Sequence, residues 1–217
     1  MRIALIHALK HSIAPTEMAF AALWPEARLV NLLDDSLSAD LARDGAIMPA
    51  MTERFLTLAR YAAGSGADGI LFTCSAFGPC IEACARELSP LPTLKPNEAM
   101  IEEAIAAGLR IGLLATFPAT LRSMPPEFPP QIDLVPQLVD GALAALDRGD
   151  TAEHDRRIVA AATALKDCDV IALAQFSMAH AAARVAEATG RAVMTTPGSA
   201  VRKLKRLLAD RPRRASI

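Results

Sequence analysis

Cys74 is the residue of this chain whose type and position are best suited to chemistry. It directly follows an apolar run, residues 69–73, and precedes a predicted helix. The N-terminus of a helix favours the thiolate, which is the form of cysteine that acts as a nucleophile or a base. A buried, inert thiol is the commoner fate of a free cysteine. The hydroxyl neighbours Thr73 and Ser75 favour the functional interpretation here.

Further polar residues follow other apolar runs, and the carboxyl ends of parallel strands are where ligands bind in α/β sheets. These residues are His7, Thr116, Thr120, Gln175 and Ser177. Hydroxyls beside helix N-termini can hold an anion, so Ser75 and Thr116, with Thr120 and Ser177, are candidates for binding a carboxylate. Ordinary helix capping is the alternative for each of them.

Three aromatic side chains follow predicted strand ends: Phe77, Phe117 and Phe176. Each could line a pocket for an apolar substituent or belong to the core. Among the histidines, His7 could orient a substrate or cap a loop. His180 could reach a substrate or stay half exposed on a helix, and His154 is expected to be solvated.

The remaining cysteines are expected to be structural. Cys80 and Cys84 lie one and two helical turns beyond Cys74 and should point into the core, and Cys168 lies at the far end of its strand. A metal site would require nearby histidines, which this cysteine pair lacks. The sequence therefore predicts no metal site.

The elements that position these residues can be predicted from two kinds of apolar pattern. Short continuous apolar runs indicate strands that are buried on both faces of a parallel sheet. Segments with apolar residues three and four positions apart indicate covering helices. The strands are predicted at residues 3–6, 27–33, 69–72, 110–114, 132–135, 170–174 and 192–194, and helices at 49–63, 79–88, 98–107, 136–146 and 153–165.

An internal repeat divides the chain into two halves. Residues 3–8, IALIHA, resemble residues 111–116, IGLLAT, and residues 69–78 align without gaps on residues 170–179. The sequence therefore predicts an α/β fold of two similar lobes, each a parallel sheet flanked by helices, related by a pseudo-twofold axis across a cleft. The proline-rich stretch 89–96 marks the division, because proline disfavours helix there. The first lobe is predicted to span residues 1–95, with 192–217 packing back on it, and the second lobe 96–191.

The bulk composition of the 217 residues excludes several classes of function. The 23 Lys and Arg residues and 24 Asp and Glu residues give a net charge of -1, so nucleic acid is an unexpected partner. The first apolar run is broken by His7, Lys10 and His11 before it reaches the length of a signal peptide or a membrane span. Four cysteines form no dense disulfide framework. We therefore expect a cytoplasmic protein that contacts no membrane and could form a homo-oligomer.

The order and spacing of these motifs resemble the aspartate/glutamate/hydantoin racemase superfamily, which includes maleate isomerases and arylmalonate decarboxylases. Thr73-Cys74-Ser75-Ala76 matches the first cysteine element of that superfamily, and residues 111–116 match its central strand and threonine. Residues 173–178 occupy the place of the second cysteine element, and residues 196–203 resemble the closing helix. The resemblance covers nearly the whole chain.

The resemblance implies that a thiol acts beside a substrate carboxylate, which hydroxyls and backbone N–H groups bind, without metal or organic cofactor. Racemases of the superfamily place one cysteine on each side of the reacting carbon, because inversion requires two proton-transfer groups. Here Gln175 stands at the second position, and an amide cannot exchange a proton at neutral pH. We therefore expect Cys74 to act alone on a small carboxylic acid, as in a decarboxylase or a cis/trans isomerase. The alternatives are a racemase whose second base is His180 or His7, and a non-catalytic protein that binds carboxylates.

Overall fold

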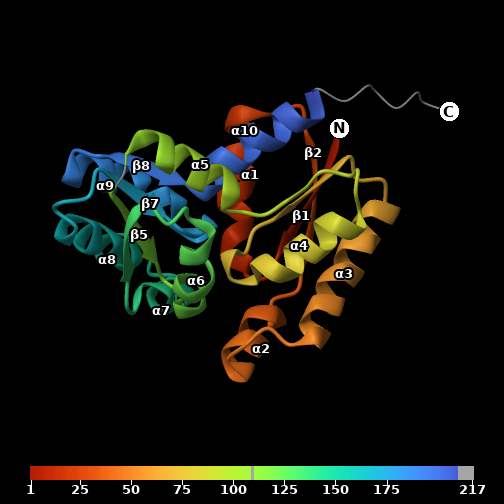
Figure 1. Ribbon diagram of the computed structural model, residues 1–217, viewed down its shortest axis with the longest axis horizontal. Helices are drawn as coiled ribbons and strands as arrows, with labels where there is room; N and C mark the ends of the chain where they lie inside the picture. Colours follow the sequence, from red (N-terminus) through yellow and green to blue (C-terminus); the bar gives the residue numbers. More distant parts are fainter. Residues whose placement is uncertain (109, 210–217) are drawn as a thin grey trace.

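Two parallel four-stranded sheets form the two lobes of the protein (Figure 1). The structure is a computed structural model that describes residues 1–108 and 110–209. The strand order is β2-β1-β3-β4 in the first sheet and β6-β5-β7-β8 in the second. The predicted α/β fold of two similar lobes is thus confirmed.

The first sheet consists of β1 (Arg2–His7), β2 (Arg28–Leu33), β3 (Gly69–Phe72) and β4 (Thr93–Leu94). Alternate side chains of β1 and β3 point to opposite faces, and each face has its own core. Ala4 and Ile6 pack with the helices α3 (Pro49–Gly64) and α4 (Gly78–Glu87). Ile3 and Leu5 pack with α1 (Ile13–Leu23) and α10 (Thr196–Ala209). The short helix α2 (Ser36–Asp44) follows β2, and Leu37 and Leu41 bury it against the α3 face.

The second sheet consists of β5 (Arg110–Ala115), β6 (Asp133–Leu138), β7 (Val170–Leu173) and β8 (Ala192–Thr195). Ile111 and Leu113 of β5 pack on one face with α5 (Glu98–Ala107). On the other face, Leu114 packs with α8 (Thr151–Ala164) and α9 (Ala182–Thr189). Further elements of this lobe are α6 (Pro118–Ser123), α7 (Ala142–Asp147) and the 3-10 helices η3 (Pro125–Glu127) and η4 (Phe176–Ala181). The helix predicted at residues 136–146 is therefore wrong in its first half, because β6 continues to Leu138 and α7 begins only at Ala142.

The strand registers show that the internal repeat is structural. Ile3 of β1 pairs with Gly69 of β3, and Ile111 of β5 pairs with Val170 of β7. The aligned segments 69–78 and 170–179 thus occupy the same place in the two sheets. Cys74 and Gln175 are consequently equivalent residues, each the second residue after the end of its strand.

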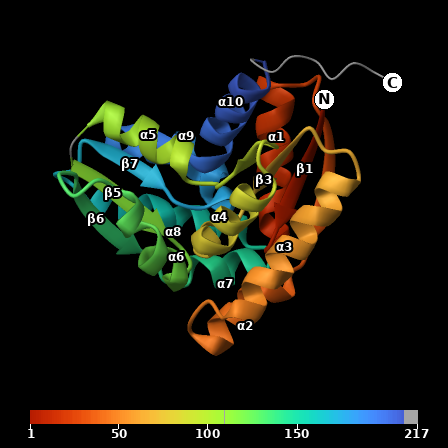
Figure 2. The same cartoon turned by 45° about the vertical axis from the view of Figure 1, so that its right-hand side comes forward.

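The C-terminal segment differs from the prediction that residues 192–217 pack back on the first lobe. Strand β8 pairs in parallel with β7, so residues 192–195 complete the second sheet. Helix α10 then crosses to the first lobe, where it lies beside α1 in both views (Figures 1 and 2). It also remains tied to α5, because Lys203 Nζ lies 2.6 Å from a Glu98 carboxylate oxygen. Residues 210–217 lie outside the described residues.

Among the described residues, no helix is long and apolar enough to cross a membrane.

Candidate active site

The thiol of Cys74 lies at the carboxyl end of β3, as the N-cap of the 3-10 helix η2 (Ser75–Phe77). Its backbone is extended, and only 8% of the residue is exposed. Burial raises the pKa of the Cys74 thiol to about 11, although hydrogen bonds from the Ala76 backbone N–H and the Ser38 side chain favour the thiolate. The Ser38 hydroxyl also donates to the Ala8 carbonyl, 3.1 Å away, so its one proton is contested.

This protonation state corrects the prediction that the helix terminus favours the thiolate. The helix that begins at Ser75 is a single 3-10 turn, and the longer α4 begins only at Gly78. The thiol therefore lies before a short turn in apolar surroundings, where desolvation of the anion outweighs the few donors nearby. At neutral pH Cys74 is a buried thiol that can give a proton.

Gln175 occupies the equivalent position at the end of β7, and its side chain is held by Thr116. The Gln175 Oε1 atom accepts hydrogen bonds from the Thr116 backbone N–H at 2.5 Å and from its hydroxyl at 3.0 Å. Both residues are buried. Thr116 thus directs two donors at one sp² oxygen, which is the arrangement required to hold an oxygen of a carboxylate.

A second pair of hydroxyls links the two lobes at the same edge. The Ser75 Oγ atom lies 3.0 Å from Thr120 Oγ1, and both side chains are buried. The Ser123 hydroxyl donates to the Ser75 carbonyl at 3.1 Å, which holds α6 of the second lobe against η2 of the first. Ala119 of α6 belongs to the same apolar cluster as Cys74. The structure therefore brings Ser75, Thr120 and Cys74 to one place between the lobes.

His7 is locked within the first lobe. Its Nδ1 atom bonds to the Thr73 hydroxyl at 2.8 Å, and its Nε2 atom bonds to Asn31 Oδ1 at 2.9 Å. Burial lowers the pKa of His7, with the bond to Asn31 and the charge of Glu17 opposing that shift. Both ring nitrogens are occupied, so His7 joins three strand ends and presents no free base to a substrate.

The other predicted site residues are buried in different surroundings. Phe176 follows β7 of the second lobe but packs in the apolar core of the first lobe with α1, so its side chain joins the two lobes. Ala76 is 2% exposed. Ser177 is also buried, and its hydroxyl has no hydrogen-bond partner among the residues that the structure describes. Cys80, Cys84 and Cys168 are buried and free, as predicted.

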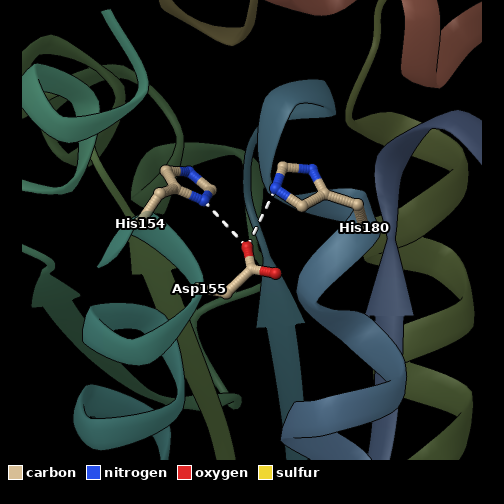
Figure 3. Close-up of side chains that lie close together, drawn as sticks. All are labelled: His154, Asp155 and His180. Carbon is tan, nitrogen blue, oxygen red and sulfur yellow. Dashed lines mark hydrogen bonds and ion pairs between the residues drawn. The ribbon is translucent and has the colours of Figure 1, made fainter. Parts of the chain in front are cut away.

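The prediction of a solvated His154 is wrong, because this residue is fully buried on α8. It forms a cluster with Asp155 and with His180, which lies on the 3-10 helix η4 (Phe176–Ala181) (Figure 3). The sequence shows the charged run around His154 but not that α8 packs against η4. Only the fold joins the two histidines.

The comparisons with known proteins agree with this architecture. The family model described as "Asp/Glu/Hydantoin racemase" matches residues 16–204. The chain belongs to the Asp/Glu/hydantoin racemase family. No curated protein sequence matches the chain.

Solved structures of racemases and of a decarboxylase have the same fold as this family member. The allantoin racemase from Klebsiella pneumoniae is 19% identical, with a TM-score of 0.71 over 96% of this chain and 88% of that one. The aspartate racemase from Picrophilus torridus is 13% identical, with a TM-score of 0.73 over 97% and 95% of the two chains. A double mutant of arylmalonate decarboxylase in its liganded form is 22% identical, with a TM-score of 0.67 over 97% and 95%. The fold is thus shared by racemases and a decarboxylase.

Proposed function

We propose that the protein is a cofactor-independent decarboxylase in which Cys74 protonates an enolate-like intermediate next to a carboxylate. The observation that carries this proposal is the asymmetry between the two equivalent strand ends. Cys74 holds a thiol whose pKa is raised by burial to about 11, and Gln175 holds an amide that cannot transfer a proton. The site thus contains one proton donor, and that donor is protonated at neutral pH.

The proposed reaction needs only that one donor. In a malonic acid that carries two different substituents at C2, the bond between that carbon and one carboxylate breaks, carbon dioxide leaves, and the electron pair remains as an enolate. The Cys74 S–H bond then breaks, and its proton passes to the carbon from one face. The thiolate recovers a proton from solvent. A single donor predicts a product of one handedness.

The retained carboxylate is proposed to bind at the hydroxyls between the lobes. The Ser75 and Thr120 hydroxyls, which lie 3.0 Å apart, can both turn their protons toward an anion. The two donors of Thr116 now hold Gln175 Oε1, whose place a carboxylate oxygen could take if the amide turned aside. Buried donors of this kind stabilise the developing enolate as well, because little solvent screens them.

Two other activities are less well supported by the same geometry. Cis/trans isomerisation by addition of sulfur to a double bond requires a thiolate, which burial of Cys74 disfavours. Racemisation requires a second base on the opposite face, where Gln175 stands. His7 is occupied by Thr73 and Asn31, and His180 binds Asp155.

The four free cysteines suit the reducing cytoplasm, which we propose as the compartment in which the protein acts.

The test is incubation of the purified protein with malonic acids that carry two different substituents at C2, and with α-amino acids, hydantoins and maleate, in heavy water. Decarboxylation of a malonic acid to a product with one deuterium and one handedness is the expected result. Exchange and loss of handedness at the α carbon of an amino acid or hydantoin would instead identify a racemase. Binding of these acids without turnover, unaffected by replacement of Cys74, would indicate a non-catalytic carboxylate-binding protein.

A further inference from the structure

A cluster of two imidazoles and a carboxylate lies in the second lobe and is not used by the proposed reaction. Asp155 Oδ1 lies 2.8 Å from His180 Nε2 and 3.1 Å from His154 Nδ1 (Figure 3). The two rings are stacked with centroids 5.0 Å apart. We propose that this imidazole cluster, His154, Asp155 and His180, binds a divalent transition-metal ion such as Zn²⁺.

The donor atoms are of the right kind and in nearly the right place. Neutral imidazole nitrogens and carboxylate oxygens are the nitrogen and oxygen ligands of zinc. One donor atom from each of the three residues lies within 4.8 Å of the other two. Neighbouring donors on a tetrahedral zinc ion lie about 3.3 Å apart, as bond lengths of about 2.0 Å require. The two observed N–O distances therefore need to widen by only a few tenths of an ångström, and the two imidazole nitrogens, which lie within 4.8 Å of each other, need to reach the same separation.

The hydrogen bonding of His154 shows which of its ring nitrogens could be a ligand. Its Nδ1 atom faces Asp155 and shares the single oxygen Oδ1 with His180. Its Nε2 atom is buried without a partner among the described residues, and it points away from Nδ1, so it cannot bind the same ion. A neutral ring that coordinates through Nδ1 carries its proton on Nε2. The candidate ligands are therefore His154 Nδ1, Asp155 Oδ1 and His180 Nε2.

Arg184 holds the other oxygen of the carboxylate. Its Nη1 atom lies 3.4 Å from Asp155 Oδ2, which leaves Oδ1 directed at the two rings. Partners of this kind orient metal-binding carboxylates in known sites. The positive charge of Arg184 opposes a cation, but the side chain is 61% exposed, so water screens that charge.

A cavity of about 650 Å³ lies beside the cluster, and His180 is the member of the cluster that lines it. Helix α1 of the first lobe contributes apolar lining residues, among them Ala14 and Met18, and Lys10 and His11 line the cavity as well. Three protein ligands with a fourth position open to a cavity are the arrangement of zinc sites that take an exogenous ligand. The metal would therefore accept a small molecule that combines an apolar body with an oxygen, nitrogen or sulfur donor. Cys74 does not line this cavity.

Metal binding can be measured on the full chain, prepared without an affinity tag and stripped with a chelator. Titration with Zn²⁺ in a calorimeter should give one ion per chain, and Co²⁺ should produce the visible absorption of a nitrogen- and oxygen-bound ion. His180→Gln and Asp155→Asn should each weaken Zn²⁺ binding at least tenfold. His11→Gln is the matched control, because His11 lines the same cavity but lies outside the cluster.

The burial of Asp155 makes unfolding a concern for its variant, so His180→Gln, at a half-exposed position, decides the matter. Zn²⁺ should raise the melting temperature of the wild-type protein and of Cys74→Ser, but not that of His180→Gln. Retained binding in Cys74→Ser would separate this site from the proposed reaction. The proposal is overturned by the absence of saturable Zn²⁺ binding, by equal affinity in His180→Gln, or by an equal loss in His11→Gln or Cys74→Ser.

Discussion

The ends of β3 and β7 have the same backbone position but different side chains. At the end of β3, Cys74 presents a buried thiol that few donors contact. At the end of β7, Gln175 presents an amide whose oxygen is held by two bonds from Thr116. The end of β3 therefore holds a group that can donate a proton, and the end of β7 holds an amide that cannot donate one and is fixed in place.

This difference shows how a duplicated fold can support a one-sided reaction. The registers of the two sheets are equivalent, so the scaffold delivers a side chain from each lobe to the same edge. The type of that side chain then determines whether a proton can be transferred to one face of the substrate carbon or to both. The predictions below change one end at a time.

The largest effect is expected from Cys74→Ser. A serine hydroxyl is a far weaker acid than a thiol, so turnover of a confirmed substrate should fall on the order of 10²- to 10⁴-fold. Folding should be unaffected, because the replacement is nearly isosteric. The measurement is the initial rate of carbon dioxide release, with circular dichroism to establish folding.

Cys168→Ser is the matched control, because Cys168 is another buried thiol and lies at the opposite end of the second sheet. It should keep the wild-type rate. Similar losses in both variants would show that the effect of Cys74→Ser is structural.

Gln175→Cys should make the two ends alike and add a second proton-transfer group. The product acid should then exchange its α proton in heavy water and lose its handedness, because the thiolate that remains after one cysteine gives up its proton can remove the α proton while the other cysteine returns a proton from the opposite face. Deuterium incorporation by NMR and chiral chromatography measure the two changes. Gln175→Ser also releases the donors of Thr116 but adds no thiol, so it should leave handedness intact. If Gln175→Ser also racemised the product acid, the racemisation in Gln175→Cys could not be attributed to its added thiol.

Alkylation of native Cys74 by iodoacetamide should be slow at neutral pH, because only the thiolate reacts. A thiol of pKa about 11 has about a hundredfold less thiolate than one of pKa 9.0. The rate should rise with pH through 9 toward 11. Over the same window the protein should lose stability, because the unfolded chain releases the Cys74 proton near pH 9 while the folded chain retains it to about 11. Mass spectrometry of the labelled peptides against pH measures the first change, and urea unfolding the second. Rapid labelling of the folded protein at pH 7 would contradict the raised pKa.

The sequence predicts most of the fold because buried parallel strands are continuous apolar runs. The repeat even predicts that Cys74 and Gln175 are equivalent, which the registers confirm. The sequence does not predict helix α1, because Ile13–Leu23 is apolar nearly all round and has no clear helical periodicity. One face of α1 lines the cavity beside His180, so apolar residues such as Met18 occur there as well as on the face that packs in the core.

The site is less predictable, because its chemistry depends on desolvation and on contacts between distant elements. The position of Cys74 follows from the sequence, but its raised pKa depends on how deeply the surrounding helices bury it. His154 stands in a charged run that is typical of a solvated helix, but α8 packs against η4 and other elements of the second lobe, and His154 is buried there. Nothing local in the sequence reports either effect.

The smallest effects are expected from the hydroxyls, and they show whether these hydroxyls bind the carboxylate. If the Ser75 and Thr120 pair binds it, Ser75→Ala should weaken binding by about 1 kcal/mol, or about fivefold, because one hydrogen bond in a buried site is lost. Thr116→Ala removes one hydroxyl bond but leaves the backbone N–H to Gln175, so its effect should be similar or smaller. Affinity for a product acid, measured by calorimetry in Cys74→Ser, avoids turnover. Thr163→Ala, at an exposed helix position, is the control. Unchanged affinity in both variants would place the carboxylate away from these hydroxyls.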